Sequence, residues 1–261
     1  MSLNVTAYHH SVSNRLLLDF RNGSLHFVVC NKAYQPLISG VFELIDEAIL
    51  DDLLKDNPLF NNIYASVQLI SSSDPFTLIP ADIESKDEQK KLFQLNHKLT
   101  EEDSLYSSLL HQDILILHRL PTYLHDAILQ KFPVCECSHA GSWLHTFVLS
   151  DGKSSGSHVY FQPDADQLKI LVIKEGKTIL LNQLFTTSDD EIFFEVMAVI
   201  EQLELDVEEL TLHPAGLTSD DIPVITQFRN YIRNMNPVIL KPINCNGQLL
   251  TNGLSTRMAC A

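Results

Sequence analysis

The sequence predicts an α/β protein made of two similar halves, each a mixed β-sheet flanked by helices. Two stretches, RLLLDFRNGSLHFVVCN from Arg15 and HVYFQPDADQLKILVIK from His158, share one pattern: an apolar run, a short turn and a second apolar run. A third strand-like segment and an acidic helix follow each stretch. Alternating apolar side chains are typical of half-buried strands. The repeat therefore predicts a duplicated β-β-β-α unit.

The first half opens with the stronger turn signal. Asn22 and Gly23 lie between two apolar runs and predict a two-residue hairpin turn, because both residues tolerate positive φ. After a third strand from Pro36, Asp46 is expected to cap a helix through EAILDDLLKD. The irregular middle that follows holds strands at 62–70 and 113–120, a charged helix at 84–99, a helix after Pro121, the short strand VCECS and a helix at 141–148.

The second half gives a cleaner pattern. Strands are predicted at 158–161, 167–174, 177–185, 209–213 and 237–243, with helices after Ser188 and at 219–235. This β-β-β-α-β-α-β order is that of a ribonuclease H-like domain. We expect Phe193 and Phe194 to pack on the sheet. The linker-like SDGKSSGS at 150–157 places the domain boundary so that residues 1–150 form the first domain and 151–261 the second, which ends in a polar tail from Asn244 expected to fray.

Composition limits the classes of partner. The 261-residue chain is 45% hydrophobic, enough for a sizeable core, and carries a formal charge of −15. A strongly acidic surface repels phosphate backbones and anionic lipid, so nucleic acid and membrane surfaces are not expected partners. No apolar run is long enough for a membrane helix, and the start lacks the pattern of a signal peptide. With five cysteines, an odd number, we expect no disulfide framework and a cytoplasmic location.

The order of strands and helices from about Arg15 to Ile243 resembles a bacterial family of unknown function whose fold is similar to that of the actin-like ATPases. Among better-known relatives, the compact chain is most similar to the pilus-assembly and cell-division branches. The resemblance covers most of the chain and rests on element order instead of short motifs. It implies a duplicated ribonuclease H-like fold in which two units clamp a nucleotide between their first turns.

The first half keeps part of the family's phosphate-binding pattern. In actin-like ATPases an Asp followed by Gly ends the first strand of each half; the carboxylate handles metal and water, and glycine lets backbone N–H groups approach phosphate. The resemblance points here to Asp19, Gly23 and Ser24, with Phe20 and Arg21 standing before the only glycine. A structural role for Asp19 is nevertheless favoured over a catalytic one, because a buried, unpaired carboxylate would be costly.

The second half has lost more of the pattern. Its first turn, QPDADQ, offers Asp164 but no glycine, and Pro163 removes an amide donor. The nucleoside-side motif is a pair of glycines after the fourth strand, and HPAGL keeps one of them, Gly216. We therefore expect a pseudo-ATPase with no cofactor, a non-catalytic protein that binds or scaffolds an unknown protein partner as a monomer or homodimer. The alternative is a weak nucleotide-binding protein or ATPase that holds Mg-ATP in the interdomain cleft.

Three further patterns could indicate a metal site, a phosphate loop or a nuclease. Cys135, Cys137 and His139 are weak candidates for a metal site, since i and i+2 side chains share a strand face. No second cysteine pair follows, and buried structural cysteines are the favoured interpretation. Gly152-Lys153 lacks the upstream glycine of a phosphate loop. A ribonuclease H-type nuclease needs converging carboxylates, which neither half supplies.

Overall fold

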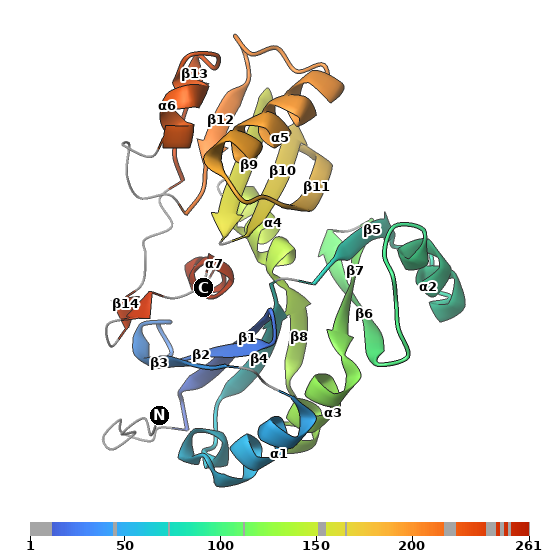
Figure 1. Ribbon diagram of the computed structural model, residues 1–261, viewed down its shortest axis with the longest axis vertical. Coiled ribbons are helices and arrows are strands. Elements are labelled where there is room, and N and C mark those ends of the chain that lie inside the picture. Colours follow the sequence, from blue (N-terminus) through green and yellow to red (C-terminus); the bar gives the residue numbers. More distant parts are fainter. Residues whose placement is uncertain are drawn as a thin grey trace. The chain divides into compact units, whose positions relative to one another are not determined.

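The computed structural model describes residues 12–43, 46–72, 74–111, 113–150, 155–164, 166–216, 223–238, 244–245, 248–249 and 252–260. The chain divides into two compact units (Figure 1). The first contains residues 1–142, 243–254 and 261, and the second contains residues 143–242 and 255–260. The division at Ser142 and Trp143 lies inside helix α4 (Ala140–Ser150) and not after residue 150, where the composition of a linker had placed it.

The first unit contains a mixed five-stranded sheet in the order β3-β2-β1-β4-β8. Its strands are β1 (Arg15–Arg21), β2 (Ser24–Cys30), β3 (Pro36–Phe42), β4 (Ser66–Ser71) and β8 (Glu136–His139). Strands β1, β2 and β3 pair antiparallel, and β4 and β8 continue the sheet in parallel. The first half thus has the predicted hairpin and third strand.

Helices α1 (Glu47–Asp56) and α3 (Thr122–Lys131) and the 3₁₀ turn η1 (Pro58–Asn61) bury one face of this sheet. Leu16 and Leu18 of β1 pack there with Leu50 of α1 and Ile128 of α3. Asp46 accepts a hydrogen bond from the Ile49 amide at 2.8 Å, which confirms the predicted helix cap. Such a cap contributes about 1 kcal/mol to helix stability.

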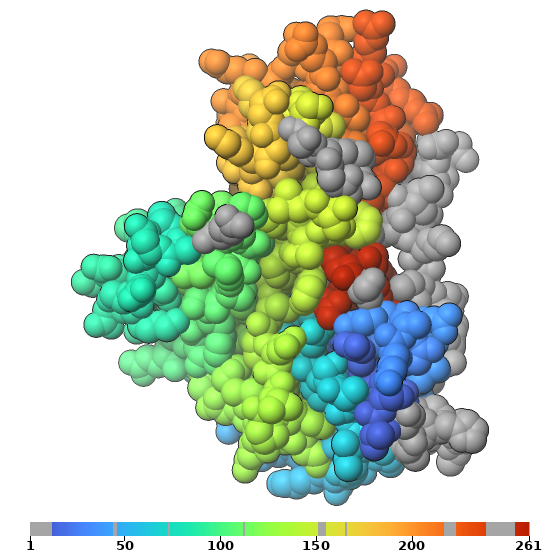
Figure 2. Space-filling view, turned by 180° about the vertical axis from the view of Figure 1, so that it is seen from behind, coloured from blue at the N-terminus to red at the C-terminus, as the bar shows by residue number. Residues whose placement is uncertain are grey.

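The middle of the first half is regular, not irregular. Strands β5 (Phe76–Pro80), β7 (Ile114–Pro121) and β6 (Asp103–His111) form an antiparallel sheet in that order. Helix α2 (Lys86–Gln94) packs on it through Phe93 against Ile79 and Leu117. The surface of this insertion is coloured teal to green in Figure 2. Strand β6 was not predicted because its serines dilute the alternation of apolar side chains in DSLYSSLLH.

The second unit repeats the architecture with the sheet order β11-β10-β9-β12-β13. Its strands are β9 (Ser157–Asp164), β10 (Gln167–Lys174), β11 (Lys177–Phe185), β12 (Thr211–Pro214) and β13 (Asn234–Met235). Helices α5 (Asp189–Gln202) and α6 (Pro223–Arg229) bury one face of it. The predicted strand 237–243 lies mostly outside the described residues, and the predicted helix ends at Arg229 instead of at residue 235.

Two expectations for the second half were wrong. Phe193 packs against Phe228 with ring centroids 5.0 Å apart, but Phe194 is 68% exposed because it lies on the outer side of α5. The chain after Asn244 was expected to fray; it instead forms β14 (Asn244–Cys245), β15 (Gln248–Leu249) and α7 (Asn252–Ala259). Residues 254–258 of α7 are buried, since tertiary contacts outweigh their polar composition.

Candidate functional site

The first turn of the first unit is a tight two-residue hairpin. Asn22 and Gly23 have φ of 47° and 77°, and Arg21 pairs with Ser24 to close the turn. Two positive φ values are the mark of a type I′ turn. This confirms the predicted hairpin. Because the turn is so short, only the Asn22 and Gly23 amides remain outside the strand ladder, and a phosphate group would find few backbone donors here.

Asp19 lies two residues before this turn on a buried polar face. It is fully buried on β1, and alternates with Leu18 and Phe20, so it projects from the face opposite the first unit's hydrophobic core. Gln68 of β4 lies on that same face and donates a hydrogen bond through Nε2 to the Glu136 carboxylate, 2.7 Å away. The first unit therefore has a buried polar face with the Asp19 carboxylate and the Gln68 amide, and the exposed Glu136 contacts that amide.

The second unit has a polar face in the corresponding place, with different chemistry. Asp164 pairs with Gln167 to close the β9–β10 turn, as Arg21 pairs with Ser24 in the first unit. Counting back two residues from each closing pair makes Gln162 the counterpart of Asp19. The second unit thus carries an amide where the first carries a carboxylate.

Internal partners occupy this second polar face. Gln162, which is 1% exposed, donates through Nε2 to Thr256 Oγ1 of α7 at 3.0 Å. Lys169 is fully buried next to it on β10, and its Nζ lies 4.0 Å from Asp164 Oδ2. A buried ammonium needs a compensating charge, and Asp164 supplies one. Asp164 therefore neutralises a side chain of its own unit.

The nucleoside-side glycine is also described in part. Gly216 has a φ of 75° and follows β12, whose neighbour Ala215 donates its amide to Phe161 O of β9 at 2.8 Å. Because β9 and β12 are parallel, Gly216 and Asp164 belong to the same edge of the second sheet. The predicted motif continues into residues 217–222, which lie outside the described part of the chain. Asp19, Gly23 and Ser24 lie together on the β1–β2 hairpin of the first unit.

Helix α7 and the residue after it pack against Trp143 of the second unit through a cation–π contact and a sulfur contact. The Arg257 guanidinium lies 4.2 Å from the centroid of the Trp143 ring in α4, which is a cation–π contact. Cys260 Sγ donates to Trp143 O at 3.4 Å. These contacts explain why the tail is ordered.

The three metal candidates come together only in part. Cys135 and Cys137 both pack against the first core, and the Cys135 thiol donates a hydrogen bond to Glu136 O at 3.8 Å. The neighbouring thiol lowers the pKa of Cys137, whereas that neighbour and burial together raise the pKa of Cys135. His139 is occupied elsewhere: its Nδ1 accepts from the Gly141 amide at 3.0 Å, which leaves Nε2–H to donate to Asp74 O at 3.0 Å. Across the described residues no three His, Cys, Asp or Glu side chains form a group that could hold a metal.

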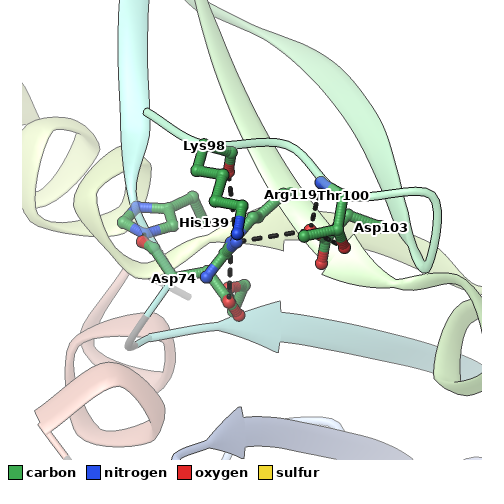
Figure 3. A network of polar contacts seen from close by, with 7 residues as sticks. Asp74, Lys98, Thr100, Asp103, Arg119 and His139 are labelled. Atoms are coloured by element: carbon green, nitrogen blue, oxygen red, sulfur yellow. Dashed lines mark hydrogen bonds and ion pairs between the residues drawn. The ribbon is translucent and has the colours of Figure 1, made fainter. Parts of the chain in front are cut away.

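A polar network that sequence reasoning missed joins the insertion to the first sheet (Figure 3). Arg119 of β7 donates through Nη1 to Asp103 Oδ2 at 3.3 Å, and its Nε lies 3.6 Å from Asp74 Oδ1. Burial raises the pKa of Asp74, while a hydrogen bond from Ser71 and the Arg119 charge oppose that rise. The network ties β4, β6, β7 and β8 together and has the character of a structural clamp.

A second group missed by sequence reasoning is His118, beside this network on β7. It is fully buried between the rings of Tyr106 and His139, at centroid distances of 6.1 and 5.7 Å. Neither ring nitrogen has a hydrogen-bond partner among the described residues. Burial lowers the pKa of His118 to about 4, so the ring is neutral at pH 7. No spacing pattern in the sequence marks such a residue.

Comparison with solved structures defines the class of protein as one with an actin-like ATPase fold. A Bacteroides thetaiotaomicron protein with actin-like ATPase fold and unknown function matches with a TM-score of 0.74 at 18% identity, over 87% of this chain and 91% of that one. A chain in the PilM–PilN type IV pilus biogenesis complex matches with a TM-score of 0.51 at 10% identity, over 87% and 89%. These likenesses establish the predicted fold, a duplicated unit with two mixed sheets.

The chain belongs to the family described as Protein of unknown function (DUF3822), whose profile matches residues 4–235. This confirms the resemblance inferred from element order. The search of curated proteins gave no match. In the part of the chain that the structure describes, no helix has the length and apolar character needed to cross a membrane.

Proposed function

We propose that this protein is a non-catalytic, actin-like-fold protein that acts in the bacterial cytoplasm by binding or scaffolding a protein partner. One observation carries the proposal: Gln162 replaces the second-unit carboxylate and is hydrogen-bonded to Thr256. An amide cannot serve as the acid that handles metal and water in an actin-like ATPase. Hydrolysis would then depend on Asp19 alone.

The neighbouring contacts support the same proposal. Asp164, the other acid near the second turn, lies against the buried Lys169 ammonium. Freeing that carboxylate for a metal ion would leave the ammonium without its counter-charge, which is costly in a buried setting. Pro163 and the lack of glycine in this turn further reduce the backbone donors available to a phosphate.

A binding role also suits the surface of the second unit. Phe185, Phe194 and Tyr231 are all more than half exposed. Large exposed aromatic side chains are more common at protein–protein interfaces than elsewhere on a surface. The likeness to a chain of the PilM–PilN complex gives the fold a precedent within a protein assembly, although at 10% identity that likeness concerns the fold alone.

The second candidate function is weak nucleotide binding or ATP hydrolysis with Mg-ATP. Two observations favour it. Asp19 is retained on the first strand, and Gly23 and Gly216 both adopt the positive φ that glycine turns near a nucleotide require. In this alternative Asp19, Gly23, Ser24, Asp164 and Gly216 would contribute to the nucleotide site.

Magnesium-dependent phosphate release from ATP separates the two functions. For the purified protein we expect release at the rate of the buffer blank, and the same rate for Asp19→Ala. Asp19→Asn, which keeps the shape of the side chain, controls for any unfolding caused by the alanine. Turnover by the wild-type protein that disappears in Asp19→Asn would overturn the non-catalytic proposal in favour of the ATPase.

A further inference from the structure

Two histidines of the second unit are hydrogen-bonded to each other on the sheet face opposite the hydrophobic core. His158 of β9 and His213 of β12 lie on paired, parallel strands, and His158 Nδ1 is 3.0 Å from His213 Nε2. His213 is fully buried, and the Tyr160 ring stacks on it with the ring centroids 4.2 Å apart. His158 is only partly buried. The fold thus holds one sheltered imidazole against one that water can reach.

The other two ring nitrogens each contact a backbone carbonyl oxygen. His213 Nδ1 lies 2.8 Å from Asn236 O, and His158 Nε2 lies 2.9 Å from Ser155 O. A carbonyl oxygen only accepts hydrogen bonds, so each of these contacts needs an N–H group on the ring. The contact between the rings needs a further proton, because two nitrogens form a hydrogen bond only when one of them is protonated. Together the three contacts require one proton more than two neutral imidazoles carry.

The additional proton fits on His158. His213 donates through Nδ1 to Asn236 O, which leaves its Nε2 as an acceptor for the other ring. His158 must then donate from both of its nitrogens, and only an imidazolium does so. Because His158 is partly exposed, water shares its charge, whereas a charge on the fully buried His213 would be costly.

The ionisable groups on this side of the second sheet include the Tyr160 hydroxyl, the Glu175 carboxylate, Asp164 and Lys169. Glu175 lies in the β10–β11 turn, and its Oε1 accepts from the Gly156 amide at 3.1 Å, next to Ser155. A carboxylate in this place is compatible with a cation on His158. Asp164 and Lys169 lie at the other end of β9 and contact each other. These charges are therefore consistent with a protonated His158.

We propose that His158 is a pH-sensitive switch that connects the chain just before β9 to β12. When His158 is protonated, its ring joins Ser155 O to His213, and His213 continues the connection to Asn236 O. When the proton leaves to water, His158 Nε2 presents a lone pair to Ser155 O, and this exposed contact opens. Histidine changes charge between about pH 5 and pH 8, so the switch is closed at the acid end of that range and open at the alkaline end.

NMR of the ring nitrogens in the isotope-labelled, full-length protein tests the proton count. At about pH 5 we expect protons on both nitrogens of His158 and a coupling to His213 Nε2 across the hydrogen bond. At about pH 8 one of these protons should be lost, while His213 keeps its proton on Nδ1. Only two ring protons on the pair at the acid end would overturn the proposal.

Hydrogen exchange tests the consequence for the backbone. After correction for the intrinsic pH dependence of exchange, protection of the Gly156 amide should fall about 10-fold towards the alkaline end, as the loss of one charge-assisted hydrogen bond predicts. His158→Gln cannot change charge and should show no such fall. His111→Gln, at the exposed end of β6 in the first unit, is the matched control and should behave as wild type. Glu175 is common to all three proteins, so its contribution cancels.

Two results of the exchange measurement would contradict the switch. One is a wild-type protein whose corrected protection at Gly156 does not change with pH. The other is an equal fall in His158→Gln, which would assign the change to another group. The NMR measurement uses the wild-type chain, so the proposal stays open to disproof even if the variant does not fold.

Discussion

Acid should destabilise this protein between about pH 6.5 and pH 4, and replacing His118 by phenylalanine should prevent a large part of that loss of stability. In the native state burial lowers the pKa of His118 to about 4, whereas in the unfolded chain the ring takes a proton at its ordinary value of 6.5. Between these values the unfolded state binds more protons, so the free energy of unfolding falls as the pH falls. The full contribution is about 3 kcal/mol, present above pH 6.5 and lost by about pH 4.

Urea unfolding at a series of pH values measures this effect. The His118→Phe variant should lose about 3 kcal/mol less than the wild type over the same window. Near pH 7 the two should be of similar stability, because the ring makes no hydrogen bond with the described residues and lies among aromatic rings. His111→Phe, at the exposed end of the adjacent strand β6, controls for the loss of a histidine. Parallel pH profiles for wild type and His118→Phe would contradict the assignment.

Replacing Lys169 by methionine should destabilise the second unit by about 3 kcal/mol, since breaking a buried ion pair leaves an uncompensated charge. Methionine can fill the volume of the lysine stem in the fully buried site, but it cannot neutralise Asp164. Thermal and urea unfolding report the loss. The result bears on function, because the loss of stability measures how strongly the Asp164 carboxylate interacts with Lys169 inside its own unit.

The double variant Lys169→Met/Asp164→Asn supplies the control for this prediction. Removing both charges also removes the uncompensated one, so the double variant should recover much of the stability that the single variant loses. If the single variant is as stable as wild type, Asp164 is not committed to Lys169. In that case the argument from the occupied second turn fails.

Local sequence patterns predicted most of the fold, because interactions between neighbouring residues determine turns and helix caps. The Asn22-Gly23 hairpin and the Asp46 cap depend on a few adjacent residues, and both were found where the sequence places them. The duplicated unit could be predicted for the same reason, since in each half two apolar runs are separated by a short turn. Strand β6 could not, because its serines dilute the alternation of apolar side chains, and helix α7 could not, because contacts with distant residues stabilise it. Thr256 of α7, for example, bonds to Gln162, far away in the sequence.

The candidate site was harder to predict than the fold. The sequence drew attention to Asp164 as the acid of the second turn, whereas the strand register makes Gln162 the counterpart of Asp19. Register depends on which residues close the hairpin, and that turn carries no signal as strong as Asn-Gly. Lys169 reads in the sequence as one charge in an apolar run. Only the pairing of β9 with β10 places it beside Asp164.

Thermal unfolding of the purified protein with and without millimolar Mg-ATP, Mg-ADP or Mg-GTP tests the central claim most directly. A ligand that binds only the native state raises the midpoint, by a free energy of about 2.7 kcal/mol at a hundredfold excess over Kd. We predict the same midpoint with every nucleotide as without any. A clear upward shift that Asp19→Asn abolishes would contradict the claim and show that the clamp still holds a nucleotide.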